Sequence, residues 1–249
     1  MSNVKHSPED GYRDDLAYIH DVGFGGFATH AAPFVLELLK AGNIRRGQVV
    51  ELGCGSGILA AALTGAGYDV LGFDISRAMV ELARKRAPAA DIRQGSFLAA
   101  ELPPCILVLA IGEIFNYLFD KQNTPAQLRK VFRAVHKALV PGGLFVFDVA
   151  LVGRVPKRRR RSYTVGEDWA CLYEAEEDPE RKTLTRRITS FRKRGDAYQR
   201  DDEVHNLRLY ERGWLVDELR TAGFRVRTVN AYGELKFPPG YLGFVARKR

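Results

Sequence analysis

The chain has 249 residues, of which 46% are hydrophobic, and this suits one α/β domain of ordinary size with or without an insertion. No apolar stretch is long enough to span a bilayer, and nothing near the N-terminus joins a basic segment to an apolar run, so we expect a cytoplasmic protein that does not contact membranes. The three cysteines are scattered without CxxC spacing, so we expect neither a metal site nor a disulfide framework.

The formal net charge of +8 raises the question of a nucleic-acid partner. Much of the excess lies in one run, Arg154 to Arg161, and in the last three residues. A run of this kind is more often a solvated loop than a binding surface, so nucleic acid is the less favoured partner.

Two helices are predicted ahead of the first strand, over residues 12–18 and 29–41. The segment between them, Gly23 to Phe27, predicts a flexible aromatic loop. This N-terminal region either packs on the core or covers a ligand site.

A glycine-rich loop follows the first predicted strand. The residues from Val49 to Gly57 read VVELGCGSG, and a helix-compatible run begins at Ile58. Alternate glycines let the backbone turn sharply, admit a ligand close to the main chain and aim free N–H groups at it. The dinucleotide fingerprint fails, because Ile58 stands where its third glycine would be. Glu51 would repel a pyrophosphate but suits an ammonium or sulfonium group.

The next segments alternate between strand and helix. A buried strand over residues 68–74 ends on Asp74, at a spacing that lets an acid reach the ribose hydroxyls of a nucleotide. A helix capped by Ser76 follows, then an edge strand over 92–97 and a central apolar strand over 105–111. A helix over 125–138, a turn at 141–143 and a strand over 144–149 complete the alternation, which predicts a doubly wound parallel sheet.

The rhythm changes after the fifth strand. From residue 162 to residue 209, short alternating segments separated by polar turns predict an antiparallel β-ribbon, inserted before a last crossover helix over 214–222. Segments 224–229 and 241–246 are expected to pair as a terminal hairpin.

The motifs ELGCGSG, GFDIS, GEIFNYL and PGGLFVFD occur in this order. The chain therefore resembles the small-molecule branch of the class I S-adenosylmethionine (SAM) methyltransferases, from about Tyr12 to the end and most strongly between Val49 and Val149. The resemblance implies an α/β, doubly wound, seven-stranded Rossmann-like sheet, with N-terminal helices and the inserted ribbon. It also implies SAM as methyl donor and S-adenosylhomocysteine (SAH) as product. We expect an N-terminal helical cap (1–46), a SAM-binding core (47–153), an inserted substrate or lid region (154–210) and a C-terminal completion of the core (211–249).

The same resemblance assigns the cofactor-binding residues. It places the glycine loop at the methionine part of SAM, Asp74 at the ribose, two apolar side chains and the 96–97 turn at the adenine, and the end of the fourth strand beside the transferred methyl. In chain order these residues are Glu51, Gly53, Cys54, Gly55, Gly57, Asp74, Ile75, Met79, Ser96, Phe97, Ile111 and Gly112.

Methyl transfer is an in-line displacement, so positioning comes first and a base is needed only to take a proton from an amine or hydroxyl acceptor. The candidate bases are Glu113, His205 and Tyr18, with Tyr210 as a further tyrosine. Cys105 lies at the start of its strand and is expected in the core rather than at a cytosine-methylating site. We expect a monomer or homodimer that methylates an N or O atom of a small molecule. The alternatives are an RNA or protein methyltransferase that uses the basic segment, and a SAM-binding module without catalysis.

Overall fold

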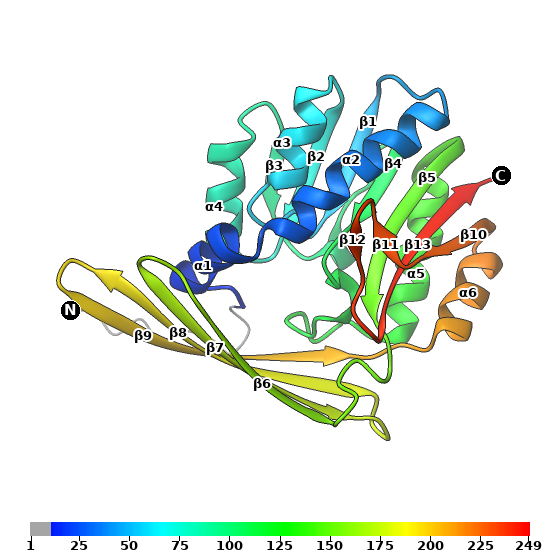
Figure 1. The fold of residues 1–249 in the computed structure, drawn as a ribbon. Helices are drawn as coiled ribbons and strands as arrows, with labels where there is room; N and C mark the ends of the chain where they lie inside the picture. The colour runs from blue at the N-terminus through cyan, green and yellow to red at the C-terminus, as the bar shows by residue number, and fades with distance from the viewer. Residues whose placement is uncertain (1–10) are drawn as a thin grey trace.

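The computed structural model describes residues 11–249, and a seven-stranded sheet forms its centre (Figure 1). The strand order is β10-β13-β5-β4-β1-β2-β3. Only β13 runs antiparallel to its neighbours β5 and β10, as predicted for the last strand. The strands are β1 (Gln48–Leu52), β2 (Asp69–Asp74), β3 (Asp91–Gln94), β4 (Cys105–Ala110), β5 (Leu139–Ala150), β10 (Phe224–Val229) and β13 (Tyr241–Lys248).

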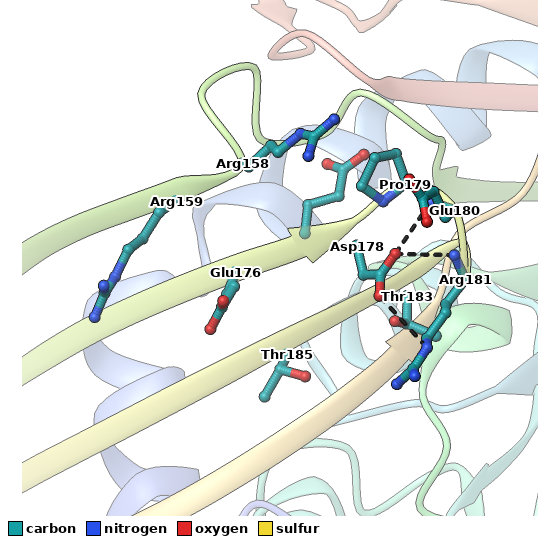
Figure 2. A pocket seen from close by; sticks show the side chains of 10 residues that line it. Arg158, Arg159, Glu176, Asp178, Pro179, Glu180, Arg181, Thr183 and Thr185 are labelled. Atoms are coloured by element: carbon teal, nitrogen blue, oxygen red, sulfur yellow. Dashed lines mark hydrogen bonds and ion pairs between the residues drawn. The ribbon is translucent and has the colours of Figure 1, made fainter.

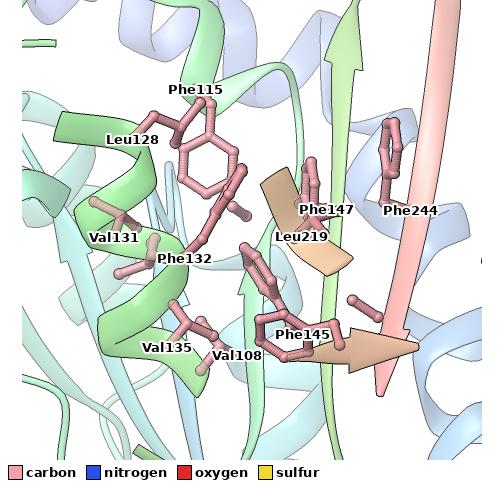
Figure 3. Packing of buried hydrophobic residues seen from close by; sticks show 14 of the residues in the cluster. Val108, Phe115, Leu128, Val131, Phe132, Val135, Phe145, Phe147, Leu219 and Phe244 are labelled. Carbon is pink, nitrogen blue, oxygen red and sulfur yellow. The ribbon is translucent and has the colours of Figure 1, made fainter. Parts of the chain in front are cut away.

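Helices cover both faces of this sheet because its strands are apolar on both sides. Phe145 and Phe147 of β5 face α5 (Pro125–Ala138) and α6 (Arg212–Thr221), whereas Leu144 and Val146 face the opposite layer. That layer contains α2 (Gly26–Ala41), α3 (Ile58–Gly65) and α4 (Arg77–Arg86). Figure 3 shows the aromatic cluster under α5, where Phe132 packs against Phe145 and Phe147. The predicted doubly wound fold is therefore confirmed.

A separate four-stranded antiparallel sheet is inserted between β5 and α6. Its strands are β6 (Arg159–Val165), β7 (Trp169–Asp178), β8 (Thr183–Arg194) and β9 (Ala197–Arg208), paired in that order. Figure 1 shows this ribbon crossing below the α/β core, with α1 (Asp14–Phe24) close to it. The chain leaves the core and returns to it at one place, since Leu151 and Tyr210 form a bridge.

Short elements complete the chain. Two single-turn helices, η1 (Phe97–Ala99) and η2 (Ile114–Asn116), follow β3 and β4. A small hairpin of β11 (Ala231–Tyr232) and β12 (Leu235–Lys236) lies between β10 and β13, so the predicted terminal pair is present but its connection is itself structured.

The aromatic loop expected at residues 23–27 is wrong. Helix α1 continues to Phe24, and only Gly25 separates it from α2, with helical dihedral angles of φ −64° and ψ −11°. The three glycines of this segment produce only a one-residue break at Gly25, because tertiary packing outweighs their low helix propensity. Within residues 11–249 no single helix is long and apolar enough to cross a membrane. Helices α1 and α2 meet the requirement for length and apolar composition only when they are taken together, and the pair is bent by 58°.

Two other local predictions also fail. Residues 141–143 are not a turn before the fifth strand but part of β5, where Gly142 at φ 78° accompanies a register shift against β4. The basic run is not simply a loop, because β6 begins at Arg159 and pairs with β7. The third strand is shorter than expected and ends at Gln94.

Candidate active site

The glycine loop turns the chain from β1 into α3. Gly53 and Gly57 have φ values of 71° and 78°, in the left-handed region that favours glycine. A Cβ atom at Gly53 would lie 2.4 Å from the side chain of Ile114, and one at Gly57 would lie 2.8 Å from the backbone of Ala83. Strand end, helix start and η2 therefore meet closely around this loop.

Asp74 ends β2 beside the loop. Its two carboxylate oxygens accept hydrogen bonds from the backbone N–H groups of Gly55 at 2.8 Å and Ser76 at 2.9 Å. Ser76 caps α4 as predicted, since its hydroxyl accepts from the N–H of Met79. Withdrawal from water raises the pKa of Asp74 to about 6, although these backbone donors oppose the shift.

Glu51, on β1, is the least satisfied acid at this edge of the sheet. Its side chain is buried, the residue being 3% exposed, and its Oε2 atom has no hydrogen-bond partner within residues 11–249. Burial, and then the nearby charge of Asp74, raise the pKa of Glu51 to about 8. A buried carboxylate without a donor suits a cationic ligand group, so this acid fits the amino end or sulfonium of SAM.

A pocket of about 70 Å³ lies against Asp74 and Gly53. It brings together five of the predicted cofactor residues, Gly53, Asp74, Ile75, Ser96 and Phe97. The other seven do not line it: Glu51, Cys54, Gly55, Gly57, Met79, Ile111 and Gly112. Met79 is buried under α1 against Ala17, which differs from the expected position beside an adenine.

A larger cavity, of about 460 Å³, lies between the core and the ribbon. Gly112, Glu113 and His205 line it, so predicted residues from the end of β4 and from β9 meet there. Tyr12 and Tyr117 line both this cavity and the small pocket, and their hydroxyl groups are 2.9 Å apart. The two cavities therefore adjoin at this tyrosine pair.

His205 is fully buried on the inner face of the ribbon. Its Nε2 lies 2.8 Å from a carboxylate oxygen of Glu203, which also accepts from the backbone N–H groups of Tyr12 and Arg13. An ionised carboxylate only accepts, so Nε2 carries the proton in the neutral ring and Nδ1 keeps a lone pair. Nδ1 has no partner within the described residues.

Glu113 is held in a network that the sequence did not indicate. Its φ of 61° is unusual for a residue other than glycine. Asp148 supports this turn by accepting the N–H groups of Gly112 and Glu113, and it also accepts the hydroxyls of Tyr232 and Tyr241. The carboxylate of Glu113 pairs with Arg186 at 2.6 Å. This ion pair makes Glu113 less available as a base than the sequence suggested.

Tyr18 does not join the other predicted catalytic residues. Its hydroxyl donates to Asp168 at 3.0 Å, and the guanidinium carbon of Arg192 lies 3.6 Å from the ring centre. It lines neither of the two adjoining cavities. Tyr210, the further tyrosine, donates its hydroxyl to the carbonyl of Phe115 and packs in the core.

A third concavity, of about 500 Å³, lies along the ribbon and is shown in Figure 2. It shares no lining residue with the two adjoining cavities and contains none of the predicted site residues. Its charged groups are engaged locally, since Asp178 accepts the backbone N–H groups of Glu180 and Arg181. This concavity is therefore not part of the candidate active site.

Four residues of the site escaped sequence reasoning: Tyr12, Asp148, Arg186 and Glu203. Asp148 could have been noticed, because it is an acid inside the apolar strand motif PGGLFVFD. Arg186 and Glu203 sit in a ribbon rich in charges, and only the strand register shows that they face inward.

The sequence also resembles known proteins. Residues 49–143 match the family model described as a methyltransferase domain. Among curated relatives, a protein named as a methyltransferase, YqeM from Bacillus subtilis, is 22% identical over 78% of this chain and 79% of its own.

Solved structures share the fold. An S-adenosylmethionine-dependent methyltransferase from Clostridium acetobutylicum superposes with a TM-score of 0.79 at 19% identity, covering 94% of this chain and 97% of that one. SAM-bound CalS10, an amino pentose methyltransferase from Micromonospora echinaspora, gives a TM-score of 0.72 at 18% identity, covering 93% and 97%. The chain therefore contains a match to a methyltransferase domain over residues 49–143, and it shares its fold with solved SAM-dependent methyltransferases.

Proposed function

We propose that the enzyme methylates an N or O atom of a small molecule bound in the cavity between core and ribbon. The observation that carries this proposal is the position of His205, which lines a cavity that adjoins the predicted cofactor pocket and whose Nδ1 has no partner within the described residues. A volume of about 460 Å³ suits a small molecule. CalS10, which shares the fold, is named for an amino sugar acceptor, and this is consistent with such a role.

SAM would supply an electrophilic methyl group on its sulfonium. We assign Asp74 to its ribose hydroxyls and Glu51 to its cationic end, because Asp74 lines the pocket and Glu51 has an unpaired buried oxygen. Ile75, Ser96 and Phe97 would enclose the adenine. In this assignment residues 47–153 and 211–249 hold the donor, the helices within 1–46 cover it, and residues 154–210 hold the acceptor.

His205 would take the proton that an amine or hydroxyl acceptor loses. Glu203 holds the ring through Nε2, and Nδ1, which has no partner within the described residues, would be the basic atom. The backbone N–H groups of Tyr12 and Arg13 keep Glu203 in place. The tyrosine pair would exclude water from the junction of the two cavities, where the methyl group passes.

We expect His205→Gln to lower kcat by roughly 100- to 10,000-fold, the range that a lost general base gives. SAH affinity should stay near that of the wild type, because His205 does not line the predicted cofactor pocket. The measurement is methyl transfer from radiolabelled SAM to a panel of small amines and phenols, together with SAH calorimetry. His30→Gln is the matched control, since His30 is exposed on α2.

Three outcomes would contradict the proposal. Transfer to RNA or protein, but to no small molecule, would favour the basic segment as the acceptor surface. SAM binding without transfer to any acceptor class would favour a binding module. A His205→Gln enzyme with full kcat would show that His205 is not the general base, even if the acceptor were a small molecule.

A further inference from the structure

The cavity between core and ribbon is unevenly charged. Three arginines line it, Arg154, Arg160 and Arg186, and Glu113 is the one carboxylate among its lining residues. The other acids nearby are engaged elsewhere: Glu203 accepts from two backbone N–H groups and from His205, and Asp148 accepts from two N–H groups and two tyrosine hydroxyls. Positive charge therefore exceeds negative charge at this surface.

Arg186 is buried in this cavity, with a side chain 9% exposed. One terminal nitrogen pairs with Glu113 and the other donates to the hydroxyl of Tyr117 at 3.1 Å. Its Nε has no partner within residues 11–249. A buried guanidinium with an unused N–H is costly unless a further acceptor completes it.

Glu113 cannot neutralise both of the inner arginines. It lies 2.6 Å from Arg186 but 3.4 Å from the Nε of Arg154, whose guanidinium also lies over the ring of Tyr241. Arg160 forms no ion pair within the described part of the chain and is exposed. The single carboxylate of Glu113 is thus shared by Arg154 and Arg186, and Arg160 has no carboxylate partner within the described residues.

Strand register places this excess charge beside the proposed base. Arg186 on β8 pairs directly with His205 on β9, and both side chains are buried on the inner face of the ribbon. Side chains at paired positions lie roughly 5 Å apart at Cβ. A ligand that touches both would therefore hold its two functional groups within a few bonds of each other.

We propose that the methyl acceptor carries an oxyanion, either a carboxylate or a phosphate, bound by Arg186 and Arg154 close to the nucleophile that reaches His205. This rests on the proposed small-molecule function and specifies its substrate class. Arginine donates in a planar fork that matches both oxyanions. The apolar and aromatic walls, among them Leu16, Phe24, Ile188 and Tyr241, would enclose the ring or chain that joins the two groups.

The test uses the full-length protein saturated with SAH and three probes with one ring: 3-hydroxybenzoate, 3-hydroxyphenyl phosphate and the neutral 3-hydroxybenzamide. We expect calorimetry to show that at least one anion binds about tenfold or more tightly than the amide, because it completes the arginine site. The preferred anion then distinguishes carboxylate from phosphate.

Arg154→Gln and Arg186→Lys should each remove most of that preference. Arg187→Gln is the matched control, since Arg187 neighbours Arg186 on β8 but is exposed and contacts Glu176 instead. SAH affinity measured for every variant shows that it is folded. Arg154, the more exposed of the two inner arginines, keeps the test informative if Arg186→Lys fails to fold.

Equal binding of the amide and both anions would overturn the proposal, as would no anion binding at millimolar concentration or an equal loss in the Arg187 control. These results concern binding alone. Failure of the proposed function would be seen separately, as the absence of methyl transfer to small molecules or an unchanged kcat for His205→Gln.

Discussion

Three acids stand near the carboxyl ends of β1, β2 and β5, and burial is the largest cause of the raised pKa of each. They differ in the hydrogen-bond donors that their carboxylate oxygens accept from. Asp148 accepts hydrogen bonds from two backbone N–H groups and two tyrosine hydroxyls. Asp74 accepts from two N–H groups and also lines a pocket. Glu51 retains an oxygen without a partner. At the scale of single residues, unused hydrogen-bonding capacity separates an acid that builds the fold from one that awaits a ligand.

We expect SAM binding near pH 7 to release a proton from Glu51. The pKa of its carboxyl is about 8 in the protein without ligand, so the group is mostly protonated, and a cationic ligand favours its ionised form. Calorimetry in buffers of different ionisation enthalpy measures the release. Glu51→Gln should bind SAM more weakly and release less. An identical proton release from the variant would show that another group titrates.

At the scale of elements, Asn116 joins the ribbon to the core. Its amide nitrogen donates to the carbonyls of Ala150 and Arg208, and its oxygen accepts the N–H of Ala150. The end of β5 and the end of β9 are thereby fixed to η2 through one fully buried side chain.

Asn116→Ala should lower the free energy of unfolding by about 3 kcal/mol, because it leaves several buried backbone groups without partners. Urea denaturation measures this, and hydrogen exchange should show faster opening at the ends of β5 and β9. Asn206→Ala is the control, since within residues 11–249 its side-chain oxygen accepts from Thr185 at the exposed surface, and its loss should cost under about 0.5 kcal/mol. Equal losses of unfolding free energy in the two variants would mean that Asn116 does not join the ribbon to the core.

The elements could be predicted where one physical signal dominated. The apolar run at β4 and the alternation of strand and helix segments predicted the sheet, and Gly-x-Gly spacing with Glu51 and Asp74 indicated the edge at which we propose the cofactor binds. The partners of His205 could not be predicted, because they depend on the register of β8 against β9 and on the backbone of Tyr12, 191 residues away from Glu203. The predictions of a loop around Gly25 and of a turn at Gly142 were wrong, because helix packing and strand pairing outweighed the local preference of glycine for turns.

At the scale of the whole molecule, buried ionisable groups set the pH dependence of stability. The folded-state pKa values of Glu51, Asp74 and Asp148 are about 8, 6 and 6, above their ordinary values. The folded state therefore binds more protons than the unfolded state, and stability is lost as pH rises through these values. Between pH 5 and pH 8, His20 and His136 act in the opposite sense, because burial lowers their pKa values, that of His20 to about 4, but they are two groups against three.

We accordingly expect the Tm of the SAM-free protein to be highest at about pH 5 and to fall toward pH 8, the reverse of the usual behaviour of paired carboxylates. Differential scanning calorimetry across this range measures it. Saturating SAH should reduce the fall of Tm toward pH 8, because the ligand stabilises ionised Glu51. A Tm that rises steadily from pH 5 to pH 8 would show that these carboxyls are not buried in the ligand-free protein.

The bridge between Leu151 and Tyr210 means that the ribbon begins and ends at one point of the core. An inserted sheet with adjacent ends can change its length, charges or inner side chains while the strand order and the glycine loop stay intact. Over evolutionary time, a methyltransferase built this way can exchange one acceptor for another by altering a single contiguous stretch of its gene, and its donor chemistry is inherited unchanged.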